Sequence, residues 1–223
     1  HDLSLELGGH ELVRSLSFVL QRGERVGIVG PNGAGKTTIL KSILGTLEPA
    51  GGRVVVGKNT KFAYFDQGRG GLAEEESVQQ NVARDRPQVT FQGRSMDIRS
   101  YLKRYLFEPH RTRERVSSLS GGERARVALA KLLLVPANVL ILDEPTNDLD
   151  VATLAALEEM LVASQSTALI VSHDRYLLDR VATKILAFEG GGRAVLYAGN
   201  YSDYRDQRAA RQAPASAADE KVA

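Results

Sequence analysis

Residues 30–38 have the sequence Gly-Pro-Asn-Gly-Ala-Gly-Lys-Thr-Thr. The stretch fits the pattern G-x-x-x-x-G-K-[ST], with its fixed positions at Gly30, Gly35, Lys36 and Thr37. The apolar run before it, Glu24–Val29, predicts a buried strand, and the helical spacing of apolar residues from Thr37 to Leu44 predicts a helix. A glycine-rich loop between a strand and a helix indicates an α/β fold built around a phosphate site.

The glycines of this loop allow backbone N–H groups to surround phosphate oxygens, and the following helix adds unpaired amides and the positive end of its dipole. Lys36 supplies a cation for the outer phosphates, and Thr37 supplies a hydroxyl for magnesium, which arrives with the nucleotide. The alternative is a glycine-rich turn that binds nothing, which the flanking strand and helix disfavour. We therefore expect nucleotide contacts from Gly30, Pro31, Asn32, Gly33, Ala34, Gly35, Lys36, Thr37 and Thr38.

Length and composition bound the class of protein. A chain of 223 residues with 43% hydrophobic and 25% charged residues suits one soluble α/β domain with room for a small second lobe. No apolar run approaches a membrane span of about 18 residues, there is no signal-peptide pattern, and the lack of cysteine excludes disulfides and cysteine metal sites. We therefore expect a cytoplasmic protein without membrane insertion. The net charge of +2 is too small to indicate nucleic acid by itself.

The two ends of the chain suggest a domain taken from a longer protein. The chain starts at His1, and residues 212–223 are small and charged in the manner of a linker. We expect the domain to occupy residues 1–211 and the tail to lead into a C-terminal extension.

Strand patterns flank the loop. Leu3–Leu7 and Leu12–Leu20 alternate apolar and polar residues around a Gly-Gly turn, which predicts an antiparallel hairpin that leads into the strand before the loop. Beyond the first helix, Arg53–Val56 and Lys61–Phe65 predict two more strands. The second ends close to Gln67, which opens another glycine-rich loop.

Residues 72–118 differ from the rest because they are polar and carry arginine at helical spacing. We interpret them, with the helix that follows, as a helical lobe over about 72–135, inserted into the core domain. Helices are predicted at Ser77–Ala83 and Met96–Leu106, and a short hairpin at Val89–Arg94. Leu102, Tyr105 and Leu106 are expected to pack inside the lobe rather than to contact a ligand.

The stretch Leu119-Ser-Gly-Gly-Glu123 precedes a long helical pattern that runs to Leu134. Ser120 with Glu123 matches S-x-x-E, which is typical of a capping box at a helix N-terminus. The glycines between them also leave that terminus open to an external phosphate. The two interpretations are compatible, and the spacing alone favours neither.

Two carboxylates end a continuous apolar strand at Val139–Glu144. Such a run is typical of a parallel strand covered on both faces, and ligands lie beyond the carboxyl ends of such strands. Acids here would be costly without a nearby cation, which magnesium or Lys36 supplies. Strand alternation predicts opposite directions for Asp143 and Glu144. We assign Asp143 to hydrated magnesium and Glu144 to an attacking water, with a purely structural pair as the alternative.

A further buried strand at Thr167–Val171 leads into Ser-His-Asp. A lone histidine is more often structural, but His173 directly follows a core strand and is placed for a role in the site. Asp174 is expected to cap the next helix. The other patterns predict a helix at Val151–Leu161, strands at Lys184–Phe188 and Ala194–Tyr197, and a helix at Ser202–Arg211.

These motifs, in this order, resemble the nucleotide-binding domain of ATP-binding-cassette (ABC) proteins over nearly the whole chain. The resemblance implies a P-loop NTPase fold: a mainly parallel, RecA-like core sheet with an antiparallel β subdomain and an inserted helical lobe. It implies a Mg²⁺-dependent ATPase with Glu144, His173 and Gln67 in catalysis and Thr37, Gln67 and Asp143 at the metal. It also implies that Ser120, Gly121 and Gly122 bind the γ-phosphate of an ATP held by a partner domain. Hydrolysis would then need a head-to-tail pair of domains.

Finer details resemble the ABC-F group, whose members are paired cassettes without a membrane domain. Sequence motifs typical of that group are found at Pro145–Asp150, Ser172–Arg180 and Tyr197–Tyr201. Glu123 stands where transport cassettes generally have glutamine. Ala63–Gln67 and Phe91–Phe107 look most like the second cassette of Uup-type members.

The ABC-F resemblance implies a second cassette, in the same parent chain or in a second copy, as partner, and action on ribosome or translation complexes and their RNA. Two alternatives stay open: the ATPase subunit of a membrane transporter, and a Uup-type factor acting on branched DNA through regions outside this chain. One departure concerns the base. Many ABC domains place an aromatic residue before the early Gly-Gly, whereas this chain has Leu7. We expect the base to rest on an aliphatic surface, which weakens any preference for ATP over GTP.

Overall fold

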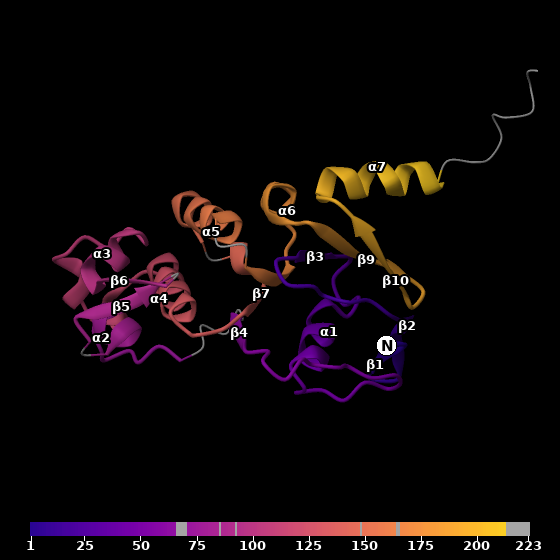
Figure 1. The fold of residues 1–223 in the computed structure, drawn as a ribbon, viewed down its shortest axis with the longest axis horizontal. Coiled ribbons are helices and arrows are strands. Elements are labelled where there is room, and N and C mark those ends of the chain that lie inside the picture. Colours follow the sequence, from indigo (N-terminus) through magenta and orange to yellow (C-terminus); the bar gives the residue numbers. More distant parts are fainter. Residues whose placement is uncertain (66–70, 85, 92, 148, 164–165, 213–223) are drawn as a thin grey trace, which may run out of the picture.

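A computed structural model describes residues 1–65, 71–84, 86–91, 93–147, 149–163 and 166–212. Within these residues the central sheet is built from β3 (Arg25–Val29), β4 (Phe62–Phe65), β7 (Val139–Asp143), β8 (Thr167–Val171), β9 (Lys184–Gly190) and β10 (Arg193–Ala198). The order across the sheet is β10-β9-β3-β8-β7-β4 (Figure 1). Neighbouring strands pair in parallel except at the edge, where β10 is antiparallel to β9.

Parallel pairing brings the carboxyl ends of three strands to one edge of the sheet. Ile28 of β3 and Asp143 of β7 both pair with Val171 of β8. The residues that directly follow these strands therefore start close together, which is where open α/β sheets bind ligands. Strand β8 is buried at every position, as predicted for a parallel strand covered on both faces.

The predicted antiparallel hairpin is confirmed as β1 (Leu3–Leu7) and β2 (His10–Leu16). Its buried leucine and valine side chains join one hydrophobic cluster with those of β3 and of α1 (Lys36–Ile43). The prediction placed the second strand at Leu12–Leu20, which is too far along the chain. Strand β2 ends at Leu16 because this residue pairs with Leu3, the first residue of β1.

The segment expected to form a helical lobe contains α2 (Val78–Ala83), β5 (Gln88–Phe91), β6 (Arg94–Asp97), α3 (Ile98–Lys103) and α4 (Gly121–Leu133), with 3-10 turns η1 (Arg111–Arg113) and η2 (Val116–Ser118). Figure 1 shows these elements together at one end of the molecule, away from α1 and the hairpin. Tyr101, Leu102 and Phe107 are fully buried among them. The lobe thus has apolar packing of its own, which is continuous with the core beneath β7 and β8.

The helix predicted at Met96–Leu106 is wrong at both ends. Met96 belongs to β6, and the helix begins only after Asp97, whose carboxylate accepts hydrogen bonds from the first-turn amides. At the other end, Leu106 has a φ of +63° and is 49% exposed. The chain reverses at this residue, so Phe107 takes the buried place that was assigned to Leu106.

The strand predicted at Arg53–Val56 is absent from the described structure. Arg53 exchanges two backbone hydrogen bonds of 3.0 Å with His1, and Gly51 forms an isolated bridge with Ser4, but no backbone pairing extends to residues 54–56 among the described residues. Val55 is 68% exposed and Val56 is 45% exposed. Two valines favour extended backbone, but without a neighbouring strand and a core to cover them they do not form a ladder.

Helices α5 (Val151–Ala163), α6 (Arg175–Val181) and α7 (Tyr201–Gln212) complete the fold, with the 3-10 turn η3 (Pro145–Asn147) after β7. Helices α5 and α7 confirm the predicted helices and are slightly longer. Gln212, which we placed in the linker, belongs to α7, and positions 213–223 lie outside the described residues. None of the helices in the described ranges is long and apolar enough to cross a membrane.

The buried hydroxyl of Tyr101 gives a test of how the lobe is held together. It donates a 2.8 Å hydrogen bond to the carbonyl of Ala130 in α4, and Tyr101 has no exposed surface. Because Tyr101→Phe leaves that buried carbonyl with one donor fewer, we expect the free energy of unfolding to fall by about 1 kcal/mol in urea denaturation. Tyr176→Phe, on a side chain that is 85% exposed, should change it by less than about 0.5 kcal/mol. Equal effects would contradict a role for this bond.

Candidate nucleotide site

The loop at 30–38 has a backbone that only glycine permits at its two ends. Gly30 has a φ of +155°, and a Cβ there would lie 2.7 Å from the Cβ of Phe188 in β9. Gly35 has a φ of +104°, and a Cβ there would lie 3.0 Å from the Cβ of Leu12 in β2. Strand β9 and the hairpin therefore pack directly against the loop, and side chains are excluded from both positions.

The N-terminus of α1 is open toward this loop. Gly35 is its N-cap, so no side chain supplies a capping hydrogen bond there. Pro31, Asn32 and Gly33 are exposed, as is Thr37 in the first turn. Free first-turn amides and the positive end of the helix dipole form a ready site for an anion.

Lys36 is folded back over the loop. Its Nζ donates hydrogen bonds to the carbonyls of Gly30 at 2.9 Å and Pro31 at 3.0 Å, and the residue is only 8% exposed. Burial lowers the pKa of Lys36, whereas the nearby carboxylates of Glu144 and Asp143 act in the opposite direction. A cation, two acids and a helix N-terminus thus lie within electrostatic reach of one another.

Asp143 and Glu144 follow one another but are held differently. Asp143 is the last residue of β7 and is 6% exposed, and its Oδ2 accepts a hydrogen bond of 3.5 Å from the hydroxyl of Tyr64 in β4. Glu144 lies beyond the strand with a φ of +51°. The strand alternation that we used to orient the pair therefore does not apply to Glu144, whose direction is set by this turn.

The environment of Glu144 suits a carboxylate that acts on something outside the protein. Its backbone amide donates to the carbonyl of Val171 at 2.9 Å, and its Oε1 is 3.2 Å from the Nε2 of His173. Its Oε2 is buried and has no hydrogen-bond partner among the described residues. A buried carboxylate oxygen is costly to leave unpaired, and such an orphaned acceptor indicates a missing partner such as water or an ion.

His173 lies where β8 ends, as predicted, and its side chain is 56% exposed. The turn around it is braced by Ser172, whose hydroxyl accepts a hydrogen bond from the amide of Asp174 at 3.0 Å. The predicted cap is confirmed, because the Asp174 carboxylate accepts from the first-turn amides of α6. The histidine ring is thus held beside Glu144 while its outer face stays open to solvent.

The stretch at Ser120–Gly122 lies elsewhere in the fold. Ser120 is the N-cap of α4, and the predicted capping box with Glu123 is confirmed. Ser120 and Gly121 are exposed. Figure 1 shows α4 among the elements of the lobe, well apart from α1, so this stretch does not join Lys36 and Glu144 in one site.

Leu7 ends β1 and is 58% exposed, so its aliphatic surface is accessible. Gln67, assigned to catalysis and to the metal, lies outside the described residues.

Sequence reasoning missed several residues that shape the site. Phe188 and Leu12 limit the space at the loop, and no motif marks them. Tyr64, the hydrogen-bond partner of Asp143, had a detectable signal. It lies near the carboxyl end of β4, which pairs in parallel with β7 and so ends at the same edge of the sheet.

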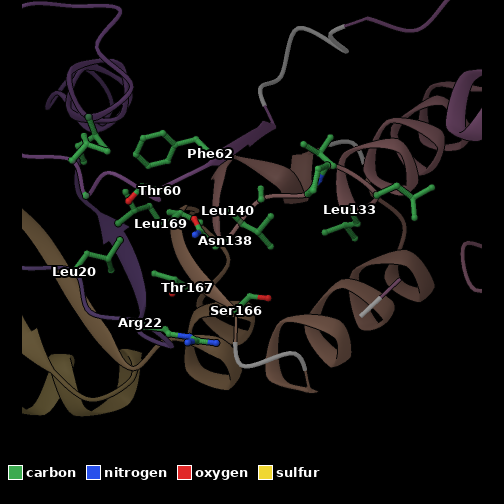
Figure 2. A pocket seen from close by; sticks show the side chains of 18 of the residues that line it. Leu20, Arg22, Thr60, Phe62, Leu133, Asn138, Leu140, Ser166, Thr167 and Leu169 are labelled. Carbon is green, nitrogen blue, oxygen red and sulfur yellow. The ribbon is translucent and has the colours of Figure 1, made fainter. Parts of the chain in front are cut away.

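A cavity of about 1650 Å³ lies away from this site. Figure 2 shows Phe62, Leu140 and Thr167 at its wall, and these residues belong to the first halves of β4, β7 and β8. The cavity therefore opens at the amino ends of the strands, opposite to the edge that carries Lys36 and Glu144. Its size does not make it the ligand site, because Lys36, Asp143, Glu144 and His173 are not among the residues that line it.

A family model described as "ABC transporter" matches residues 13–147. Curated relatives include an "ATP-binding protein Uup-like" of Haemophilus influenzae, 47% identical over 93% of this chain and 45% of the relative. The Escherichia coli K12 "ATP-binding protein Uup" is 45% identical over 93% of this chain and 33% of its own. The "Energy-dependent translational throttle protein EttA" of the same strain is 40% identical over 93% of this chain and 37% of its own length. The chain thus spans less than half the length of these three relatives.

Solved structures agree on the fold. The "ATP binding subunit of ABC transporter" has a TM-score of 0.74 at 24% identity, covering 95% of this chain and 93% of the other. A dimeric, post-hydrolysis structure of the ATP-binding cassette MJ0796 with ADP and phosphate has a TM-score of 0.66 at 19% identity, covering 88% and 96%. Together with Lys36, Asp143, Glu144 and His173 at one sheet edge, the matches show that the chain belongs to the ATP-binding-cassette family, as an ABC ATPase domain with relatives in the ABC-F group.

Proposed function

We propose that this domain hydrolyses ATP at Glu144 as one half of a head-to-tail pair of cassettes, and that the pair acts on ribosome or translation complexes. One observation carries the proposal. The described structure brings Lys36, Asp143, Glu144 and His173 to one edge of the sheet, while the Ser120 stretch faces solvent from another part of the molecule. Half of a phosphate site is present at the edge, and a second phosphate-binding surface is left for another molecule.

Each residue at the edge has a distinct task in this proposal. The amides of the loop and of α1 bind the phosphates, and Lys36 moves from its two carbonyl contacts to the outer phosphates. Glu144, with its orphaned Oε2, orients a water and accepts its proton. His173 fixes Oε1 of Glu144 and contacts the γ-phosphate with its exposed face.

The oxygen donors present also fit Mg²⁺. Thr37 offers an exposed hydroxyl and Asp143 a carboxylate near Lys36, and oxygen is the ligand type that Mg²⁺ prefers. Thr37 and Asp143 would hold the ion together with the nucleotide, and the ion would supply positive charge that offsets the charge developing during transfer. Gln67 is proposed to join this set.

The pairing follows from the separated Ser120 stretch. A helix N-terminus with two exposed or half-exposed glycine positions, Gly121 and Gly122, admits a phosphate without steric hindrance. Because this surface does not face the chain's own loop, the γ-phosphate that it binds belongs to a partner. A dimeric arrangement is named for the solved cassette MJ0796, which supports pairing here.

The proposed target rests on the translational role that the name of EttA states for that protein. The described residues contain no candidate membrane-spanning helix, and this finding does not indicate which complex the protein acts on. Action on branched DNA and service to a membrane transporter are therefore outcomes that the experiment below must be able to reveal.

Glu144→Gln tests the chemistry. Because a positioned base contributes about 100-fold or more, we expect the steady-state rate of phosphate release to fall by at least about 100-fold while ATP binding, measured by calorimetry, is retained. Glu159→Gln, the same change at an exposed position on α5, should leave both unchanged. Turnover close to that of the unmodified protein would remove Glu144 from the role of base.

Sedimentation with ribosomes tests the target. We expect the full-length protein, with Glu144→Gln and the equivalent change in any second cassette, to pellet with ribosomes in ATP and to stay in solution in ADP, because hydrolysis no longer reopens the pair. Parallel tubes contain branched DNA or membrane vesicles. Binding to one of these instead of to ribosomes would overturn the target and leave the ATPase chemistry in place.

A further inference from the structure

The phosphate-binding end of α4 carries a carboxylate that interacts with the serine expected to meet the phosphate. The backbone amide and the hydroxyl of Ser120 both donate to Oε2 of Glu123, each at 2.9 Å. The hydroxyl hydrogen is therefore committed to a negative group in this structure. A carboxylate at this place stabilises the helix, since it faces the positive end of the dipole.

The same carboxylate opposes the binding of a phosphate. A γ-phosphate that approaches Ser120 would lie within a few side-chain lengths of Glu123, and like charges at such distances repel measurably even in a partly aqueous setting. The helix end alone would have to offset this repulsion. Some further positive charge is needed for a glutamate in this stretch to be compatible with a nucleotide.

Two arginines supply that charge. Nη1 of Arg111, in η1, is in direct contact with Oε1 of Glu123, and Nη2 of Arg126 is 3.8 Å from the same oxygen. The side chain of Glu123 is 16% exposed and that of Arg126 is 11% exposed, so solvent screens these contacts only in part. The pKa of Glu123 lies at about 2, mainly because of the hydrogen bond from Arg111.

Both arginines are fixed by other groups and do not depend on the nucleotide for their position. Arg111 donates two further hydrogen bonds of 3.1 Å through Nε, and one of 2.8 Å through Nη2, to Glu114. Arg126 pairs with Asp150 and lies over the ring of Phe107 at 5.7 Å. A guanidinium held in this way is preorganised to neutralise a neighbouring charge.

We propose that Arg111 is a positioning residue that neutralises Glu123, and thereby allows the Ser120 stretch to bind the γ-phosphate of the partner cassette's nucleotide. Arg126 supports it near the same carboxylate oxygen. The proposal rests on the head-to-tail pairing proposed above and specifies a residue on which that pairing depends. It predicts that the requirement for Arg111 exists only while position 123 carries a negative charge.

A double-mutant cycle tests this dependence in the full-length protein on the Glu144→Gln background. The readout is the ATP concentration that gives half-maximal closure of the pair, followed by small-angle scattering. We expect Arg111→Gln to raise that concentration about tenfold, which corresponds to about 1.4 kcal/mol, and Glu123→Gln to change it little. In the double variant, the ATP concentration for half-maximal closure should lie within about threefold of the value for Glu123→Gln, since no carboxylate is left to neutralise.

A merely structural role for Arg111 gives a different result. If Arg111 only holds the lobe together, the double variant stays as defective as Arg111→Gln, and that outcome overturns the proposal, as does normal closure with Arg111→Gln. Arg115→Gln serves as control, because Arg115 pairs with Glu75 and both side chains are largely exposed, at 69% and 79%. If Arg111→Gln unfolds, Arg111→Lys keeps the charge and must retain closure, whereas loss of closure in a folded Arg111→Lys contradicts the proposal.

One further variant separates this proposal from the one on which it rests. Gly122→Asp places a charged side chain at the helix end and should abolish closure if the Ser120 stretch meets a partner's phosphate. If closure persists, the pairing itself is wrong and the proposal for Arg111 falls with it. If Gly122→Asp abolishes closure while the cycle shows no rescue, the pairing stands and only the role of Arg111 is wrong.

Discussion

The parallel pairing of β7 with β8 is the constraint on which the site depends. Asp143 pairs with Val171, and one residue later the amide of Glu144 still donates to the carbonyl of Val171 at 2.9 Å. This last bond holds the backbone of Glu144 while its φ of +51° turns the chain away from the sheet. A slip of one residue would exchange the two faces of β7, and the carboxylate that contacts His173 would be lost from the edge.

The strain at Glu144 is consistent with a functional position. A positive φ at a non-glycine residue is uncommon and is tolerated where the surroundings over-determine it. Here the hydrogen bond to the carbonyl of Val171 holds the backbone of Glu144, and the contact with His173 holds its side chain. The buried, unpaired Oε2 adds a second unfavourable feature at the same residue. A water or ion that reaches this oxygen removes the second unfavourable feature, whereas the positive φ remains.

Much of the fold could be predicted because local patterns and the global structure agree. The loop at 30–38, the strand before Asp143 and the cap at Ser120 each have a short-range physical cause, so the sequence alone indicates them. The errors arise where distant residues decide. Arg53–Val56 has strand propensity but finds only His1 as a partner, and Leu106 is exposed because the chain reverses there. Phe188 leaves room only for glycine at position 30. It lies at the loop because β9 is the neighbour of β3 in the sheet.

The lobe and the segment that follows Glu144 are joined by charge as well as by packing. Arg126, in α4, pairs with Asp150, and Asp150 also accepts hydrogen bonds from the amide and hydroxyl of Thr153 in the first turn of α5. Asp150 follows Glu144 by six positions in the sequence. An arginine that is 11% exposed is costly to leave unpaired, so α4 and Asp150 have to move together. In the pairing proposed above, a phosphate at the N-terminus of α4 would therefore be linked through Arg126 and Asp150 to the segment that follows Glu144.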